Sequence, residues 1–167
     1  MSAKVCFVTG SARRIGASII RKFAEEGYAV LIHVSSSIDA GNELKSELIK
    51  KGMQADLVQA DLSDESQTSD LISRVSEHSF TQQRGGIDVL VHNASVYEQI
   101  PISKLNLEAM RFLNRLHVEA PLQLSQGFHH LLSSVQGSIV ALTDTSAGKA
   151  WSELSHYTSS KAGLRQL

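Results

Sequence analysis

The stretch VCFVTGSARRIGASII, residues 5–20, begins as an apolar run and continues through a glycine-containing turn into a segment with helical periodicity. Gly10 and Gly16 allow the backbone to approach a ligand and let the helix pack close to the strand. At such a turn the start of the helix presents free N–H groups and a partial positive charge, which bind a phosphate. The stretch therefore predicts a strand, a phosphate-binding turn and a helix, in that order.

The rest of the chain repeats this alternation of short apolar runs and helical segments, which is typical of a parallel sheet covered on both faces by helices. Strands are expected at Lys4–Thr9, Ala29–Val34, Ala55–Ala60, Ile87–His92 and Ser138–Thr143. Helices are expected at Arg14–Glu26, Asp39–Lys51, Glu65–His78, about Leu107 to Leu132, and from near Ser155 onward. We expect one three-layer α/β domain over residues 1–167. Because the last helix reaches Leu167 without a cap, we also expect the sheet to be incomplete on its C-terminal side.

Composition limits the classes of partner. With 42% hydrophobic residues and a net charge of −1, the chain is expected to bury a core and to bind a small molecule rather than a nucleic acid. The single cysteine, Cys6, lies in an apolar run, which excludes an internal disulfide and favours a reducing cytoplasm. No apolar run approaches the roughly 18 residues of a membrane span, and the histidines lack metal-site spacing, so neither a membrane nor a metal is expected.

The first turn and the end of the second expected strand indicate which nucleotide would bind. Arg14 stands where a G-x-x-x-G-x-G turn has its middle glycine, and Arg13 precedes it. The strand ends in His33-Val-Ser-Ser36, without the acidic residue that would bind a ribose 2′-hydroxyl and repel a 2′-phosphate. NADP is therefore expected over NAD, although the two arginines also suit a solvated surface. The pair Asp61-Leu62 fits an adenine contact and, equally, the start of the next helix.

Tyr157 and Lys161 are four residues apart, which places a phenol and an ammonium group on one face of a helix. A free tyrosine has a pKa of about 10, and a nearby cation favours the phenolate, which would bring the phenol towards general-acid work near neutral pH. The spacing alone is common by chance. Its position after the fifth expected strand of a chain that begins with a phosphate turn indicates a catalytic pair.

The motifs TGSARRIG (9–16), VHNAS (91–95) and YTSSK (157–161) together resemble the ordered motifs of the short-chain dehydrogenase/reductase family, and the resemblance covers the whole chain. It implies a Rossmann-type doubly wound parallel sheet that binds NADPH. It also implies that Tyr157 exchanges the substrate proton and that Lys161 binds the nicotinamide ribose. With the strand ends above, the expected cofactor-binding residues are Gly10, Arg13, Arg14, Ile15, Gly16, His33, Ser36, Asp61, Leu62, Asn93, Ala94 and Ser95.

One departure from the family pattern narrows the resemblance. The family usually has a serine about thirteen places before the tyrosine, where this chain has Asp144, and an Asp–Tyr–Lys arrangement resembles the pteridine reductases. The segments RRIG, HNAS and LHVEAP (116–121) are similar to those of the dihydromonapterin reductase branch. This implies reduction of a dihydropterin by NADPH, with Asp144 and Tyr157 supplying the proton, Tyr97 stacking on the ring and Ser95 close to the substrate.

Other interpretations of these residues stay open at this point. Asp144 also suits a turn, Tyr97 a loop aromatic packed on the sheet, and His117, where many family members have Asn, a helix residue with a satisfied contact. The rival functions are a carbonyl reductase of the same fold, acting on an oxoacyl, sugar or other ketone, and a nucleotide-binding protein without turnover. By resemblance we expect a homodimer or homotetramer.

Overall fold

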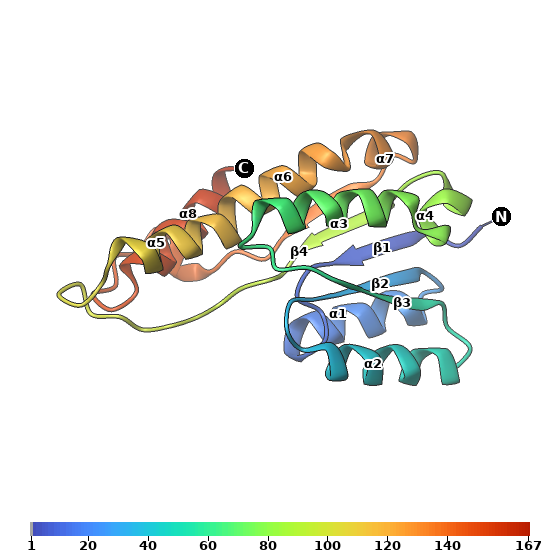
Figure 1. Cartoon of the computed structure of the whole chain (residues 1–167), viewed down its shortest axis with the longest axis horizontal. Coiled ribbons are helices and arrows are strands. Elements are labelled where there is room, and N and C mark those ends of the chain that lie inside the picture. The colour runs from blue at the N-terminus through green and yellow to red at the C-terminus, as the bar shows by residue number, and fades with distance from the viewer. Residues whose placement is uncertain (1) are drawn as a thin grey trace.

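The computed structural model describes residues 2–167, and its strands form one parallel sheet (Figure 1). The strands are β1 (Val5–Val8), β2 (Ala29–Val34), β3 (Ala55–Gln59), β4 (Val89–His92) and β5 (Ser138–Ala141). Their order in the sheet is β3-β2-β1-β4-β5. The chain therefore winds outward from β1 in one direction and then returns to its other side, which confirms the doubly wound α/β fold. The crevice where such a fold binds ligands lies where the order reverses, between β1 and β4.

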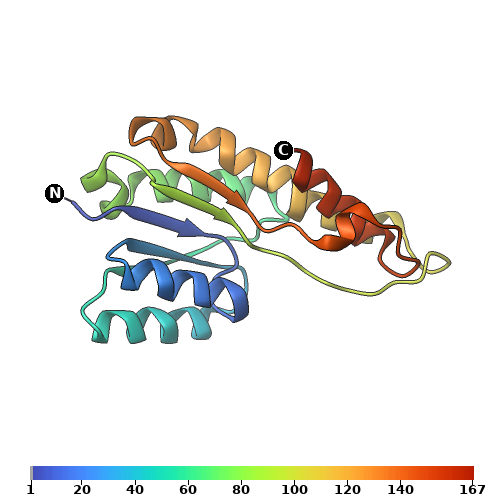
Figure 2. The ribbon, with the colours of Figure 1, turned by 180° about the vertical axis from the view of Figure 1, so that it is seen from behind.

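Helices lie on the two faces of this sheet and form three layers with it (Figures 1 and 2). On one face lie α1 (Arg14–Glu25) and α2 (Ile38–Lys50), and on the other lie α3 (Glu65–Glu77), α4 (Ser79–Arg84), α6 (Ala120–Gly127) and α7 (His129–Ser134). The remaining helices, α5 (Leu107–Asn114) and α8 (Ser155–Gln166), pack on each other beyond the carboxyl ends of the strands. This arrangement brings the start of α8 to the edge where the crevice opens.

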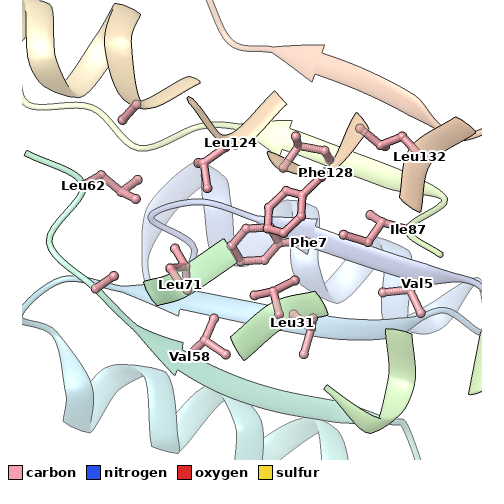
Figure 3. Packing of buried hydrophobic residues seen from close by; sticks show 14 of the residues in the cluster. Val5, Phe7, Leu31, Val58, Leu62, Leu71, Ile87, Leu124, Phe128 and Leu132 are labelled. Atoms are coloured by element: carbon pink, nitrogen blue, oxygen red, sulfur yellow. The ribbon is translucent and has the colours of Figure 1, made fainter. Parts of the chain in front are cut away.

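Alternate residues of each strand feed two separate cores, as expected for a sheet covered on both faces. In β1, Val5 and Phe7 face α3 and α6, whereas Cys6 and Val8 face α1 and α2. The ring of Phe7 meets that of Phe128 edge to face at a centroid distance of 5.8 Å, at the centre of the first core (Figure 3). Burial raises the pKa of the Cys6 thiol, which agrees with its interpretation as a small core residue.

The ends of most strands and helices lie within two residues of those expected from the sequence. One expected helix, however, is not a continuous α-helix. The single helix expected from about Leu107 to Leu132 is interrupted by a π-helical turn, η1 (Arg115–Glu119), and again at Phe128. Pro121 supplies a reason, because proline has no N–H for the carbonyl four residues earlier and its ring crowds that carbonyl. The wider π turn accommodates this loss.

A short helix, α4, was not expected. The ring of His78 caps it by accepting a hydrogen bond from the Phe80 N–H at 3.2 Å, and Gly85 ends it at φ +77°. Histidine is a rare cap, so the sequence carried no recognisable start signal. The expected N-cap Asp64 is confirmed, since its carboxylate accepts hydrogen bonds from the N–H groups of Ser66 and Gln67. None of the helices described between residues 2 and 167 has the length and apolar character that crossing a membrane requires.

Candidate active site

The turn after β1 passes so close to the end of β4 that only glycine fits at two positions. A Cβ atom on Gly10 would lie 2.8 Å from the Ala94 Cα, and one on Gly16 would lie 2.6 Å from the Asn93 Nδ2. Gly10 also has a φ of +61°, in the left-handed region that glycine tolerates. The two glycines expected from the sequence are therefore required by the backbone geometry of this turn.

Arg14 occupies a conformation that suits glycine. Its φ is +52°, whereas Arg13 is extended at φ −140°. Arg14 is also the first residue of α1, whose first turn has no side-chain cap. Uncapped N–H groups at a helix start are the donors that bind a phosphate. The turn thus keeps the backbone shape of a glycine at residue 14 while presenting a guanidinium group there.

His33 ties this turn to the neighbouring strands. Its Nδ1 accepts a hydrogen bond from the Gly10 N–H at 2.9 Å, and its Nε2 lies 3.1 Å from the Ala60 carbonyl, which can only accept, so Nε2 carries the proton. The His33 N–H donates to the Ser11 Oγ at 3.0 Å. Burial lowers the pKa of His33 to about 4. Both ring nitrogens are occupied, so His33 can act on a cofactor only through the shape of the turn.

Asn93 joins the turn from the β4 side. Its Nδ2 donates to the carbonyls of Thr9 and Gly10, each at 2.9 Å, and its backbone N–H shares the Thr9 Oγ1 with the N–H of Ala94. The carboxyl ends of β1 and β4 are thereby held together where the strand order reverses. Asn93 was expected near the cofactor by resemblance, and the structure places it beside the phosphate turn.

These elements open onto a cleft of about 660 Å³ that extends from the phosphate turn to α8. It contains every expected site residue except Ser36, whose place in the lining is taken by Ser35. The lining residues foreseen from the sequence are Gly10, Arg13, Arg14, Ile15, Gly16, His33, Asp61, Leu62, Asn93, Ala94, Ser95, Tyr97, Asp144, Tyr157 and Lys161. One continuous cleft therefore joins the expected nucleotide site to the expected catalytic pair.

At the far end of the cleft, Asp144 and Tyr157 are hydrogen-bonded. The Tyr157 hydroxyl donates to the Asp144 Oδ2 at 3.0 Å, and the Ser146 N–H donates to the Asp144 Oδ1 at 2.8 Å. Asp144 begins the short 3-10 turn η2 (Thr145–Gly148), which presents its carboxylate to the phenol. Lys161 lies one turn along α8 from Tyr157; its Nζ donates to the Leu142 carbonyl at 3.0 Å and lies 5.9 Å from the Tyr157 ring centroid.

The protonation states differ from those expected from the sequence. Burial and the Asp144 carboxylate raise the pKa of Tyr157 to about 12, so the expectation of a phenol pKa lowered below its ordinary value is wrong. Hydrogen bonds from Ser146 hold the pKa of Asp144 below its ordinary value, and burial lowers the pKa of Lys161. At neutral pH the phenol is therefore protonated and the carboxylate is ionised. The proton available in this cleft is on Tyr157, not on Asp144.

Tyr97 and Ser95 lie on the loop that follows β4. The Tyr97 ring meets the Tyr157 ring at a centroid distance of 5.1 Å and an angle of 77°, and 59% of Tyr97 is exposed. An exposed aromatic face beside the phenol suits a flat ligand. Ser95 has a smaller, lowering effect on the pKa of Tyr157, against the larger effects of burial and Asp144.

Several residues of the cleft carried no functional signal in the sequence. Phe112 and Leu116 line it from the α5 and η1 segments, but apolar residues at helical spacing are equally expected of a core. The Leu142 carbonyl that holds Lys161 is a backbone group, which no side-chain pattern reveals. Within the part of the chain described, no group of three or more His, Cys, Asp or Glu side chains is arranged to hold a metal ion.

The doubly wound sheet, the glycine turn and the Tyr/Lys pair at the carboxyl ends of the strands define the class of nucleotide-binding α/β proteins. A family model described as short chain dehydrogenase matches residues 4–167. The chain belongs to the short-chain dehydrogenase family.

Named relatives are similar over nearly the whole chain. An uncharacterized oxidoreductase of Thermotoga maritima is 30% identical over 98% of this chain and 62% of that protein. The 3-oxoacyl-(acyl-carrier-protein) reductase FabG of Staphylococcus epidermidis is 26% identical over 96% of this chain and 64% of that protein. The structure of FolM alternative dihydrofolate reductase 1 from Brucella canis, complexed with NADP, aligns with a TM-score of 0.86 at 29% identity, over 98% of this chain and 64% of that one. The chain thus spans 62–64% of the length of these proteins.

Proposed function

We propose that the protein is an NADPH-dependent reductase whose substrate is a dihydropterin. The choice of NADPH rests on Arg13 and Arg14 beside the phosphate turn, and on the serines, Ser35 and Ser36, where an acidic residue would reject a 2′-phosphate. The Brucella FolM structure was determined with NADP, which supports the same choice. When bound, NADPH supplies the hydride.

The residues of this chain fit such a cofactor. The turn at Gly10 and Gly16 leaves room for a pyrophosphate against the start of α1, and the cleft continues from there to Tyr157 and Lys161. We infer that Lys161, whose Nζ donates to the Leu142 carbonyl and lies 5.9 Å from the Tyr157 ring centroid, would bind the ribose next to the nicotinamide. These residues would hold the reactive end of the cofactor beside the proton donor.

Tyr157 donates the proton. Its raised pKa keeps the phenol protonated at neutral pH, as a general acid requires, and the ionised Asp144 accepts its hydrogen bond and so orients it. Tyr157 would give its proton to the nitrogen of the substrate C=N bond whose carbon receives the hydride that bound NADPH would supply. The phenolate is then reprotonated from solvent. Asp144 takes part as an anion throughout.

A dihydropterin is favoured by the carboxylate of Asp144, and this single observation carries the substrate assignment. An ionised carboxylate has about four acceptor positions, of which Ser146 and Tyr157 occupy two. The remaining acceptor positions of the Asp144 carboxylate suit the N–H groups on the amidine-like edge of a pterin. Tyr97 offers a stacking face beside the phenol, and the Brucella relative is described as an alternative dihydrofolate reductase.

A ketone reductase is the second candidate, because the phenol of Tyr157 protonates a carbonyl oxygen equally well. The relative FabG, a 3-oxoacyl reductase, favours it. In that case Asp144 only orients the phenol, and a neutral hydrogen-bonding side chain would replace it. A homodimer or homotetramer, expected from the resemblance, stays a prediction.

The test is NADPH oxidation by the purified protein with dihydromonapterin, dihydrobiopterin, dihydrofolate and a panel of ketones including an oxoacyl thioester. We expect turnover of a pterin, its loss in Tyr157→Phe, and a large rise in KM for the pterin in Asp144→Ser. Matched controls are Tyr28→Phe, whose ring packs against Phe23, and Asp70→Ser on the exposed side of α3. Reduction of ketones alone, with Asp144→Ser fully active, would replace the pterin assignment by the ketone one.

A further inference from the structure

His117 lies at the one place where the long helical segment widens. Within η1 the N–H of Ala120 bonds to the carbonyl of Arg115, five residues earlier, as in a π helix. Such single π turns are frequent at functional sites. Here the turn directs the His117 side chain inward, where it is 1% exposed, towards α8 and the loop after β4.

Both ring nitrogens of His117 have partners from other segments. Nδ1 lies 2.8 Å from the Ser160 Oγ on α8, and Nε2 lies 3.4 Å from the backbone nitrogen of Val96, next to Tyr97. The ring also meets that of Tyr157 edge to face at 5.8 Å. His117 therefore contacts, at once, the loop that carries Tyr97 and the helix that carries Tyr157.

The proton on each nitrogen follows from the partners. The Ser160 hydroxyl lies 2.8 Å from the Tyr157 carbonyl, which can only accept, so the hydroxyl proton points there. The Ser160 oxygen must then accept a hydrogen bond from Nδ1–H, and Nε2 is left with a lone pair for the Val96 N–H. Each bond in the chain has one proton, so a neutral imidazole satisfies it completely.

A charged imidazole does not fit this arrangement, since a proton on Nε2 would oppose the Val96 N–H. Burial and the nearby Lys161 ammonium lower the pKa of His117 to about 3, in agreement with the geometry. The chain of hydrogen bonds also begins and ends on backbone groups, the Val96 amide and the Tyr157 carbonyl. It therefore offers no outlet through which a proton could reach the substrate.

We propose that His117 is a positioning residue: its two hydrogen bonds, called here the His117 joint, connect the loop at Val96 to α8 at Ser160. The joint thereby fixes the position of the exposed Tyr97 ring relative to Tyr157, and so the face on which a flat substrate ring would stack. The inference rests on the proposed function in that Tyr157 is the proton donor. It extends to any flat substrate of this cleft. Loss of the His117 joint should weaken the binding of the substrate ring and leave proton transfer from Tyr157 unchanged.

The test compares variants that keep different parts of the joint. His117→Leu removes both bonds, His117→Asn can reach only Ser160, and His117→Gln places an acceptor at the distance of Nε2. We expect KM for the substrate to rise about five- to tenfold in His117→Leu, because the bond to Val96 that holds the Tyr97 loop is lost, with kcat within about twofold. His117→Gln should recover most of the loss and His117→Asn little. The exposed His130→Leu is the matched control.

A second measurement needs no substrate. Amide hydrogen exchange at Val96 should accelerate in His117→Leu, recover in His117→Gln, and stay unchanged in His130→Leu, while thermal melting and NADPH affinity show that each variant is folded. Unchanged exchange and unchanged KM in His117→Leu would overturn the proposal. So would a fall in kcat of about a hundredfold with loss of the acidic limb of its pH profile, which marks a proton-transfer group. If exchange behaves as expected but no pterin or ketone is turned over, the joint stands and the proposed function fails.

Discussion

Replacing Arg14 by glycine has two separately measurable effects: it relieves the backbone strain at residue 14, and it removes the positive charge there. Arg14 has a φ of +52°, which costs a non-glycine residue about 1–2 kcal/mol, and glycine removes that cost. Glycine is also more flexible than arginine in the unfolded chain, which lowers the free energy of unfolding by about 0.4–1 kcal/mol. Arg14→Gly should therefore raise the free energy of unfolding by up to about 1.5 kcal/mol, or about 3–6 °C in Tm for a domain of this size. The same change removes one charge-assisted contact to a 2′-phosphate, which should weaken NADPH about tenfold and leave NADH unchanged.

The assay is denaturant unfolding together with fluorescence titration of both nucleotides. Arg13→Gly is the matched control, because Arg13 is extended at φ −140° and has no strain to release. It should weaken NADPH to a similar degree while giving no gain in stability. A loss of stability of about 0.4–1 kcal/mol or more in Arg14→Gly would show that the Arg14 backbone is unstrained, because only the flexibility of glycine would then count. Equal weakening of NADPH and NADH would show that Arg14 does not contact the 2′-phosphate.

Three further predictions concern the turn and the proton donor. Gly16→Ala places a Cβ 2.6 Å from both the Asn93 Nδ2 and the Gly10 carbonyl oxygen. It should lower the free energy of unfolding by about 1–3 kcal/mol and weaken NADPH binding. Unchanged stability and NADPH affinity in this variant would contradict the close approach of the turn to β4. The pKa of His33 is about 4 in the folded protein and 6.5 for a free imidazole. Between these two pH values the unfolded chain is protonated at His33 and the folded chain is not, so acid favours unfolding. Stability should fall by about 2 kcal/mol between pH 7 and pH 4.5, and this fall should shrink in His33→Gln in chemical unfolding; an equal fall in both proteins would assign it to other groups. Tyr157→Phe should reduce kcat by about 10²–10⁴ with an unchanged Kd for NADPH, and a smaller loss would mean that another group delivers the proton.

Local patterns in the sequence determined the succession of strands and helices along the chain and the form of the turn after the first strand. The run before Thr9, the glycines at 10 and 16 and the spacing of Tyr157 and Lys161 each depend on residues within one element and its neighbour. Hydrophobic period and glycine freedom act over that range, so they can be recognised without knowing what packs against them. Most expected site residues consequently line one cleft.

Tertiary structure alone decided the protonation states and the hydrogen-bonded joints. The pKa of Tyr157 rises because burial and Asp144 outweigh what the spacing to Lys161 suggested, and burial is a property of the packed molecule. His33 holds Gly10 and Ala60, and His117 holds Val96 and Ser160, across 21 to 43 positions of the chain. Partners so far apart in sequence meet only when the sheet and α8 are assembled. The sequence therefore determined which groups the cleft contains, and the assembled fold determined which of them carry protons and which hold the others in place.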